Sequence, residues 1–349
     1  MHDTRPPPLS HRVYGEVFFM CKRDYTANKK PLTIDEQISL LTERGLQGEE
    51  SQIRQALSLM TYYHFSGFCF HFLQKDEAEN ILEKFIHGTN ISHIIRRYRF
   101  DLDLRHLLFV AIDHIETFLR RTWVEQTCYK FDAFYYSESS HYNNWPEHTR
   151  TINDIEKKAK FKQGHRGKEP FVAHYEKTYS NERLPIWMAS EFMDFGDLTY
   201  FIKYSCTDIQ ASIAKELNLP ISVLDSFLRA LNTLRNACAH HSRIWDKQFG
   251  TRPMLPNRNC DVHWYAYYDE RWLLPSLKKI KKSCGALETS HIGFLMFICR
   301  YFMNVISCDS DWHTNLVKLF DSYHITAEEL RLMGLPKHWN MHPLWLIGK

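Results

Sequence analysis

Apolar residues recur at the three-to-four-residue spacing of an α-helix along most of the chain. In Ile91–Glu125, for example, Leu104, Leu108 and Ile112 mark one face over several turns. The other segments with a helical pattern are Ile34–Leu46, Glu49–Met60, Pro185–Tyr204 (two pieces that meet near Gly196), Asp208–Leu217, Ile221–His241, Tyr265–Lys282, Ile292–Ile306 and Asn315–Tyr323. No segment shows a convincing alternation of apolar and polar residues. The pattern therefore predicts an all-α protein.

The chain has 349 residues, which exceeds the usual size of a single hydrophobic core. We expect an N-terminal helical region over residues 1–90 that packs on a helical core over residues 91–250. The core has a polar, basic insertion near residues 137–170, and a C-terminal helical region follows over residues 251–349. The apolar run Gly293–Met303 is short and contains Arg300, so it predicts a core helix rather than a membrane span.

Composition and charge limit the kinds of site that this protein can have. The formal net charge is only +3, so any surface that binds nucleic acid would have to be a local cluster of basic residues. The nine cysteines include no pair at the spacing of a zinc or redox motif, so we expect reduced thiols and neither a metal nor another cofactor. Three prolines, Pro6–Pro8, stand where a signal peptide would need an apolar stretch. These features favour a cytoplasmic protein without a membrane span.

Two local clusters allow two interpretations each. The aromatic block Thr61–Phe72 fits a buried core better than a base-stacking surface. Basic residues gather in the insertion and near residue 280, where they could form a solvated face or grip RNA phosphates. The basic residues considered for RNA binding are Lys157, Lys158, Lys160, Lys162, Arg166, Lys168, Lys278 and Lys279.

The segment Ile221–His241 carries the strongest chemical signal. Its apolar residues share one helical sector, and Arg235 falls inside that sector. Because a guanidinium keeps its charge, Arg235 needs a carboxylate, a polar cleft or an anionic ligand. One alternative is an ion pair with Glu116 or Asp113 that merely joins two helices.

His240 follows Arg235 by five residues, which is ~140° around a regular helix. Both side chains can act on one atom only if the helix ends or distorts near Ala239, or if a second copy of the chain supplies the complementary residue. Asn236 adds an amide that could orient a phosphate. Glu116 and Arg120 stand at i,i+4 on the earlier helix and could form a simple ion pair or belong to the same site.

The segment from Arg235 to Trp245, RNACAHHSRIW, resembles the R-x4-H signature of HEPN domains. Four further segments are similar to the Abi-like abortive-infection proteins, the group that includes AbiD and AbiF, and stand in the family order. They are KPLTIDEQISLLTERGL from Lys30, YYHFSGF from Tyr62, RYRFDLDLRHLLFVAIDHIETFLR from Arg97 and PIWMASEFMDFGDL from Pro185. The resemblance covers roughly Lys30 to Trp245.

This resemblance implies a HEPN-type helical bundle that cuts RNA without a metal. His240 would move a proton to or from the ribose, and Arg235 would stabilise charge on the phosphoryl oxygens. Asn236 would support them, and Glu116 and Arg120 would line or brace the site. The products would carry 2′,3′-cyclic phosphate and 5′-hydroxyl ends. A homodimer with a composite active site is expected.

We therefore expect an endoribonuclease effector of abortive infection, held in check by a partner such as a small non-coding RNA or a protein. One alternative is a HEPN module that binds RNA or a partner without cleaving it. Another is a plain helical scaffold in which Arg235 only forms a buried ion pair.

Overall fold

The computed structural model describes residues 31–142, 145, 147–164, 167–254, 289–306, 311–335, 337 and 339–346. These residues are mostly helical, which confirms the predicted all-α class. The chain divides into two compact units, residues 1–102 and residues 103–349. The predicted helix Tyr265–Lys282, with Lys278 and Lys279, lies outside the described residues, as does Arg166.

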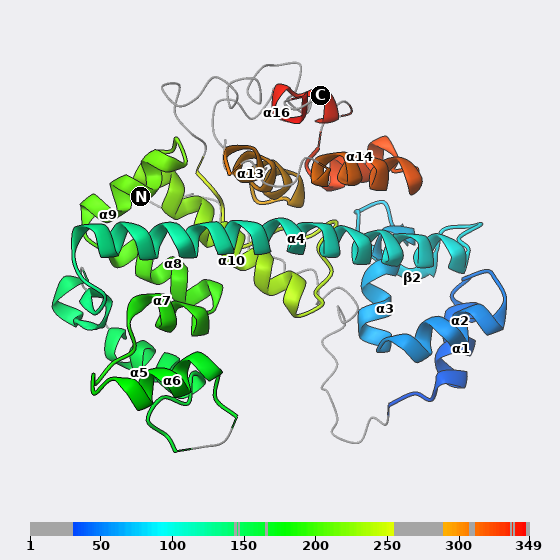
Figure 1. Cartoon of the computed structure of the whole chain (residues 1–349). Coiled ribbons are helices and arrows are strands. Elements are labelled where there is room, and N and C mark those ends of the chain that lie inside the picture. Colours follow the sequence, from blue (N-terminus) through cyan, green and yellow to red (C-terminus); the bar gives the residue numbers. More distant parts are fainter. Residues whose placement is uncertain are drawn as a thin grey trace, which may run out of the picture. The chain divides into compact units, whose positions relative to one another are not determined.

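The first unit is built from three short helices, a hairpin and the start of a long helix (Figure 1). Its elements are α1 (Ile34–Glu43), α2 (Glu50–Leu59), α3 (Tyr62–Cys69), the 3₁₀ turn Phe70–Phe72, β1 (Leu73–Lys75), β2 (Ile81–Phe85) and the first residues of α4 (Ile91–Lys130). Thr33 begins α1 with a reciprocal capping box to Glu36. Phe65 and Phe68 of the aromatic block are buried, and the Phe68 ring meets Tyr98 of α4 edge to face. The prediction that this block forms core is confirmed for these two rings.

The prediction of no strands was wrong at this hairpin, which forms the two-stranded sheet of the described residues. Leu73 pairs with Phe85, and Lys75 pairs with Ile81, in an antiparallel ladder. The strands have only three and five residues, which is too short for an alternating pattern to stand out in the sequence. A contact with a distant segment helps to hold the hairpin. The guanidinium of Arg44, at the end of α1, lies 2.5 Å from the carboxylate of Glu83 in β2.

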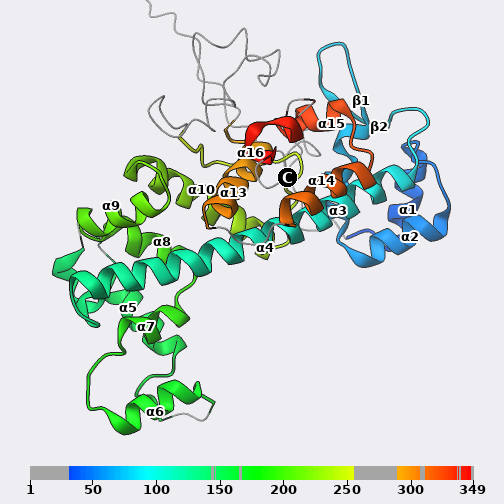
Figure 2. The ribbon, with the colours of Figure 1, turned by 45° about the horizontal axis from the view of Figure 1, so that its top comes forward.

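The second unit holds the rest of α4 and the remaining helices (Figures 1 and 2). Apolar residues of α4, among them Leu108, Ile115 and Trp123, are fully buried in this unit. The α-helices after α4 are α5 (His148–Lys158), α6 (Pro170–Thr178), α7 (Ile186–Ala189), α8 (Phe195–Tyr204), α9 (Thr207–Glu216), α10 (Ile221–Ala239), α13 (Ile292–Val305), α14 (Trp312–Ser322), α15 (Ala327–Leu332) and α16 (Pro343–Leu346). Short 3₁₀ turns lie at Tyr135–Ser137, Ser139–His141, Ser190–Phe192 and Trp339–Met341.

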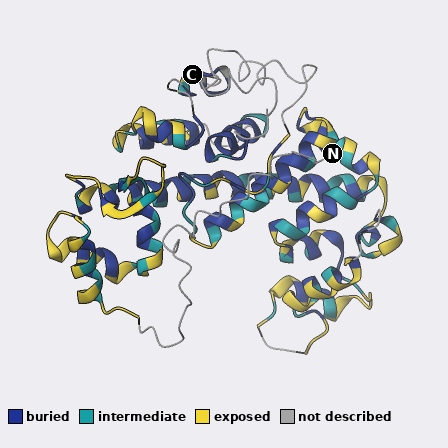
Figure 3. Cartoon of the chain, turned by 180° about the vertical axis from the view of Figure 1, so that it is seen from behind, coloured by how far each residue is buried: buried dark blue, intermediate teal, exposed yellow. Residues whose placement is uncertain are grey.

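Helix α10 is the centre of this unit, because it packs against α8, α9 and α13 (Figure 1). Leu224, Phe227, Leu231 and Leu234 of α10 are all buried, as their spacing predicts. Helix α13 is buried along almost its whole length, and Figure 3 shows it in dark blue. The prediction of a core helix at Gly293–Met303 is therefore confirmed.

Polar groups of the large aromatic residues join distant segments of the second unit. The Trp312 indole N–H of α14 donates to the Leu107 carbonyl of α4 at 2.7 Å, and the Tyr301 hydroxyl of α13 donates to the Leu217 carbonyl at 2.8 Å. Trp123 of α4 donates to the Ser205 hydroxyl after α8 at 3.2 Å. Buried Trp and Tyr side chains need such partners, so these bonds join α14 and the end of α8 to α4, and α13 to the end of α9.

His148, at the start of α5, gives this unit a pH-dependent stability. Burial is the largest influence on the ring and lowers its pKa below the ordinary value of 6.5, despite a 2.7 Å hydrogen bond with the Tyr136 carbonyl. The folded state therefore binds fewer protons than the unfolded state below pH 6.5. The His148 contribution to stability is present above that pH and is lost as the pH falls below it.

We expect the free energy of unfolding of wild type to fall with pH more steeply below pH 6.5 than that of His148→Gln. The slope difference is at most about 1.4 kcal/mol per pH unit, because one proton is involved. Glutamine keeps an N–H donor for the Tyr136 carbonyl but does not titrate. Urea unfolding between pH 5 and 8 measures the slopes, and parallel slopes for the two proteins would contradict the assignment.

None of the described helices combines the length and the apolar character that crossing a membrane requires.

Candidate functional site

Helix α10 ends at Ala239, which is one of the two arrangements that a shared role for Arg235 and His240 requires. The His241 N–H donates to the Cys238 carbonyl, and the Ser242 N–H donates to the Ala237 carbonyl at 2.9 Å. These two bonds form a Schellman motif, with His240 as the C-cap. His241 has a φ of +56°, a left-handed conformation that histidine tolerates better than most residues. The chain therefore leaves the helix immediately after His240.

The segment after the cap is anchored in the core. Ile244 and Trp245 are almost fully buried, and the Arg243 guanidinium lies 2.9 Å from the carboxylate of Asp246. Because this anchor begins three residues after His240, the backbone at the helix end is held on both sides. His240 itself is exposed, and its ring has no hydrogen bond to a described residue. An exposed imidazole on a fixed backbone is available to a ligand.

Arg235 lies one turn before this helix end and is half-buried. No carboxylate of the described residues lies within ion-pair distance of its guanidinium, which approaches the Asn236 side-chain oxygen at 3.5 Å. Arg235 therefore does not form the ion pair with Glu116 or Asp113 that was one alternative. The Arg235 charge still acts on its surroundings, since it contributes to the lowered pKa of Asp194 and opposes the rise that burial causes in the pKa of Glu116.

Glu116 and Arg120 form the predicted i,i+4 pair on α4, with a carboxylate-to-guanidinium distance of 2.6 Å. Both side chains are largely buried. Arg120 also donates to two carbonyls of the turn before α8, at Ser190 and, at 3.2 Å, at Met193. Burial is the largest influence on Glu116 and raises its pKa, although Arg120 and Arg235 act in the opposite direction. Arg120 thus ties α4 to the turn that precedes α8, and both Arg120 and Arg235 act electrostatically on Glu116.

Asp194 is a site residue that the sequence analysis did not single out. It begins α8 with a capping box to Asp197, and its carboxylate lies 3.4 Å from Lys158 of α5. Burial acts to raise the pKa of Asp194, but the hydrogen bond from the Asp197 N–H and the charges of Lys158 and Arg235 lower it overall. The D-x-x-D spacing at the start of a helix is the signal that could have identified this cap.

Gly196 explains how close α8 comes to α10 at this point. A Cβ atom at Gly196 would lie 3.0 Å from the Asp194 carboxylate and 3.6 Å from the Asn232 side chain of α10. Asn232 stands one turn before Arg235, so the start of α8 and the second half of α10 are in contact beside the arginine. The structure therefore brings Glu116, Asp194 and Arg235 into one electrostatic neighbourhood.

The basic residues of the insertion are mostly engaged in local contacts. Lys158 pairs with Asp194 and, at 3.0 Å, with Asp197, and Lys168 pairs with Glu176. The Lys160 ammonium donates to the Gly167 carbonyl at 2.9 Å. Lys157 and Lys162 are exposed and form no ion pair with a described residue. Only part of the predicted phosphate-binding cluster is thus free of carboxylate partners within the described residues.

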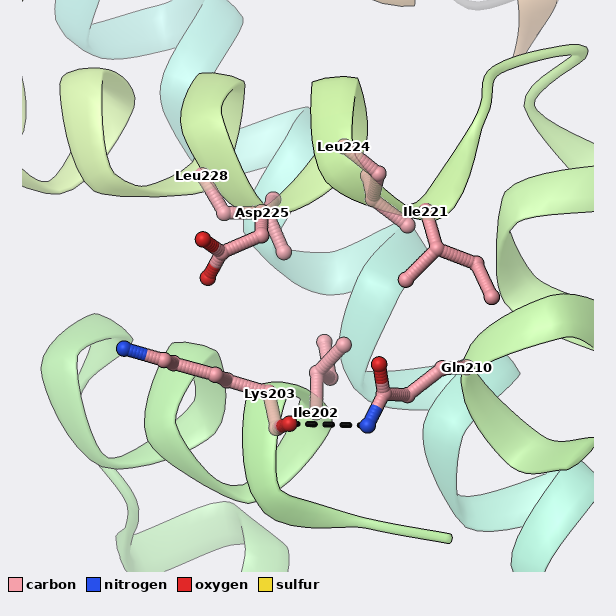
Figure 4. Close-up of a pocket in the computed structure, with 7 residues that line it drawn as sticks. All are labelled: Ile202, Lys203, Gln210, Ile221, Leu224, Asp225 and Leu228. Atoms are coloured by element: carbon pink, nitrogen blue, oxygen red, sulfur yellow. Dashed lines mark hydrogen bonds between the residues drawn. The ribbon is translucent and has the colours of Figure 1, made fainter. Parts of the chain in front are cut away.

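A shallow depression lies between α8, α9 and α10 (Figure 4). Its floor is apolar, and the polar ends of Lys203, Asp225 and Gln210 lie around it (Figure 4). It belongs to the first half of α10, whereas Arg235 is about 10 Å further along the helix axis than Leu228. Within the residues that the structure describes, no group of three or more His, Cys, Asp or Glu side chains could hold a metal ion.

Comparison with known proteins identifies the family. The family model described as "Abi-like protein" matches residues 55–246, which is more than half of the chain. The match contains Glu116, Arg120, Asp194, Arg235 and His240. Searches of curated proteins and of solved structures gave no match. On the strength of the family match, this chain belongs to the Abi-like protein family.

Proposed function

We propose that this protein is a metal-independent endoribonuclease of the HEPN type that acts in abortive infection. The observation that carries the proposal is that the end of α10 presents both an exposed His240 and a half-buried Arg235. Arg235 has no ion-pair partner among the described residues. Membership of the Abi-like family and the R-x4-H spacing support it. The cytoplasm, where RNA is abundant, is the proposed location.

Arg235 is suited to hold the scissile phosphate. A guanidinium presents five N–H donors in a planar fork, and those of Arg235 make only one long contact, 3.5 Å to the Asn236 side chain. The Glu116 and Asp194 carboxylates are near enough to interact electrostatically with this guanidinium but form no ion pair with it. A phosphate of the RNA would then take two N–H donors of Arg235, and the charge that develops on its oxygens would be stabilised.

His240 is suited to transfer the proton. An imidazole can accept a proton from the ribose 2′-hydroxyl, or donate one to the leaving 5′-oxygen, near neutral pH. The 2′-oxygen forms a bond to the neighbouring phosphorus, and the bond from phosphorus to the 5′-oxygen breaks. The products carry a 2′,3′-cyclic phosphate and a 5′-hydroxyl. Asn236, which is exposed beside Arg235, would contact the same phosphate.

Glu116 and Arg120 act as positioning residues in this proposal. Arg120 fixes the turn at Ser190–Met193 to α4, and Glu116 pairs with Arg120 and also interacts electrostatically with Arg235. Their ion pair is largely buried, so removal of one partner would leave the other charge without compensation in a poorly solvated place. The pair keeps the start of α8 and the end of α10 beside one another.

A second copy of the chain completes the site in this proposal. Arg235 and His240 are ~140° apart around α10, although the helix ends between them. A two-fold axis near the end of α10 would let the Arg235 of one copy work with the His240 of the other. Exposure of both Asn236 and His240 at this end leaves room for such a contact.

An RNA or protein partner would hold the enzyme in check, because an unrestrained ribonuclease harms its host. Lys157 and Lys162 are the described cations of the insertion that remain available to a small RNA. The second candidate function is a HEPN module that binds RNA or a partner without cleavage. Lys158, Lys160 and Lys168 are held by local contacts, and a surface with fixed side chains suits binding without catalysis.

The experiment that tests the enzyme is cleavage in the absence of metal. Purified protein is incubated in EDTA with a labelled single-stranded RNA and, separately, with DNA of the same sequence. We expect fragments from the RNA and none from the DNA, because DNA lacks the attacking 2′-hydroxyl. Cleavage of both, or cleavage that EDTA stops, would contradict the mechanism. Intact RNA at all conditions would favour the non-catalytic module.

A further inference from the structure

Three aromatic rings lie together at the end of α8, away from the residues that carry the proposed chemistry. The rings of Trp145 and Tyr204 are parallel within 5°, with centroids 6.1 Å apart. The Trp145 and Tyr200 rings are 6.3 Å apart at 12°, and the Tyr200 and Tyr204 rings are also 6.3 Å apart at 12°. The three centroids therefore form a nearly equilateral triangle, and the three rings face the same direction. We call these residues the aromatic triad.

The triad rests on a buried base. The Trp145 ring meets Phe201 edge to face at 4.6 Å and His148 edge to face at 5.4 Å. Phe201 is fully buried, and His148 is held by its hydrogen bond to the Tyr136 carbonyl. Edge-to-face contacts with fixed rings restrict the rotation of Trp145. The triad is consequently a preorganised surface, so a ligand that stacks on it loses little free energy to ordering.

The triad is partly exposed, because Tyr200 is exposed and Trp145 and Tyr204 are half-buried. Tyr200 is 50% exposed, and the described residues offer no hydrogen-bond partner to the hydroxyls of Tyr200 and Tyr204. The Lys203 ammonium lies 5.1 Å from the centroid of the Tyr204 ring, which places a cation beside the rings. Tyr200 is the only large apolar side chain of α8 that is exposed.

Helix α8 connects the triad to the proposed site. Asp194 caps the start of α8, and the charge of Arg235 contributes to its lowered pKa. Tyr204 is the last residue of α8. The helix has ten residues, so the two ends are about 15 Å apart. Gly196, Tyr200 and Lys203 fall within about 60° around the helix, and Gly196 faces Asn232 of α10. Tyr200 and Lys203 therefore lie on the side of α8 on which Gly196 faces α10.

Charges near the triad suit a polyanion. Lys203 and Asp225 both border the depression between α8 and α10, where their polar ends lie on the same side (Figure 4). The Asp225 carboxylate is paired with Arg229 at 3.2 Å, so its charge is balanced. Lys203 forms no ion pair with a described residue, which leaves one uncompensated cation next to the rings.

We propose that the aromatic triad of Trp145, Tyr200 and Tyr204, with Lys203, is a stacking surface for the bases of single-stranded RNA. The inference rests on the proposed function, because it places bases of the substrate a few nucleotides from the phosphate at Arg235. Stacking does not depend on base identity. The surface therefore adds affinity and fixes the path of the RNA strand, and it does not select a sequence.

The size of the patch favours bases over a protein partner. A stable protein interface buries roughly 800 Å² on each side, whereas a fully buried aromatic side chain contributes about 150–250 Å². Three partly exposed rings with one lysine are too small for that interface and match one or two bases. The open tyrosine hydroxyls and the cation also favour a polar ligand over an apolar protein core.

The test measures binding without cleavage. The probe is a fluorescein-labelled single-stranded 2′-O-methyl oligouridine of about ten nucleotides, whose blocked 2′-oxygen prevents the proposed reaction. The full chain is titrated against it as wild type, Tyr200→Ala, Tyr200→Phe and Tyr129→Ala. Tyr129 is the matched control, since it is 81% exposed at the end of α4 and has no ring partner among the described residues.

We expect Tyr200→Ala to bind about tenfold more weakly than wild type, because one stacking contact is lost. Tyr200→Phe and Tyr129→Ala should bind like wild type, and an abasic version of the probe should not distinguish Tyr200→Ala from wild type. Equal affinity of Tyr200→Ala and Tyr129→Ala would overturn the proposal, as would a wild type that does not bind the probe. A change of sedimentation mass in Tyr200→Ala with unchanged probe binding would also overturn it and assign the triad to self-association. None of these outcomes depends on whether the enzyme cleaves RNA.

Discussion

Replacement of His240 by alanine is expected to lower the rate of RNA cleavage by about 10²- to 10⁴-fold, the range that a positioned acid or base supplies. His240 is exposed, and its ring forms no hydrogen bond or ion pair with a described residue, so its loss should cost the fold little. The thermal midpoint of unfolding should stay within a few degrees of wild type. Single-turnover cleavage of labelled RNA gives the rate, and circular dichroism gives the midpoint.

The neighbouring His241 provides a matched control for this substitution. Both histidines are exposed and adjacent, but His241 adopts the left-handed conformation of the Schellman motif and so leaves the helix in a different direction. We expect His241→Ala to retain cleavage near the wild-type rate. Loss of activity in His241→Ala, with an active His240→Ala, would transfer the proton-transfer role to the other histidine. Unfolding of His240→Ala would instead support the scaffold interpretation.

Replacement of Arg235 is expected to have the second-largest effect. Both Arg235→Ala and Arg235→Lys should lower cleavage about 10²- to 10³-fold, because a lysine ammonium cannot replace the planar fork on a phosphate. The fold should tolerate either change, since Arg235 has no ion pair among the described residues. In Arg235→Ala the pKa of Glu116 should rise further, because one of the charges that lower it is gone.

Arg229 supplies the control for Arg235, since it belongs to the same helix and is exposed on another side. Its guanidinium pairs with Asp225, and we expect Arg229→Ala to cleave RNA within about twofold of wild type, since an exposed pair contributes little to the fold. The same cleavage assay and a thermal melt test all three variants. An Arg235→Lys variant with wild-type activity would show that only charge is needed, and this outcome would contradict bidentate binding of the phosphate.

Local pattern was sufficient to predict the helices that carry the site. The spacing of Leu224, Phe227 and Leu231 gave the buried face of α10, and those side chains are buried in the structure. The angle between Arg235 and His240 left two arrangements open, a helix end near Ala239 or a second copy of the chain, and the helix does end at Ala239. The apolar run that forms α13 was recognised as core because it contains Arg300 and is too short to span a membrane.

What the sequence could not reveal are contacts between distant segments. The carbonyls of Ser190 and Met193 accept hydrogen bonds from Arg120, about 70 residues earlier in the chain. Every residue has a backbone carbonyl, so the residue types do not indicate which carbonyls accept a hydrogen bond from Arg120. Asp194 was visible as a helix cap but not as a neighbour of Arg235, because that proximity depends on how α8 packs on α10.

The same limit applies to charge and to aromatic residues. A cluster of lysines indicates a basic surface, but the partners of Lys158 and Lys168 are acidic residues that folding brings close. The sequence analysis considered base stacking at Thr61–Phe72, where Phe65 and Phe68 prove to be buried. The partly exposed rings lie instead at Tyr200 and Tyr204 of α8 and at Trp145, which is more than 50 residues earlier in the chain.

The chemical identity of the fragment ends tests the central claim most directly. RNA cut by wild-type protein in EDTA is treated with polynucleotide kinase under conditions that phosphorylate a free 5′-hydroxyl, and the 3′ ends are assigned by mass spectrometry. The account predicts 2′,3′-cyclic phosphate and 5′-hydroxyl ends, because the ribose 2′-oxygen is the nucleophile. Fragments with 3′-hydroxyl and 5′-phosphate ends would mean that water or a metal-bound hydroxide attacks, and would contradict the assignment of Arg235 and His240.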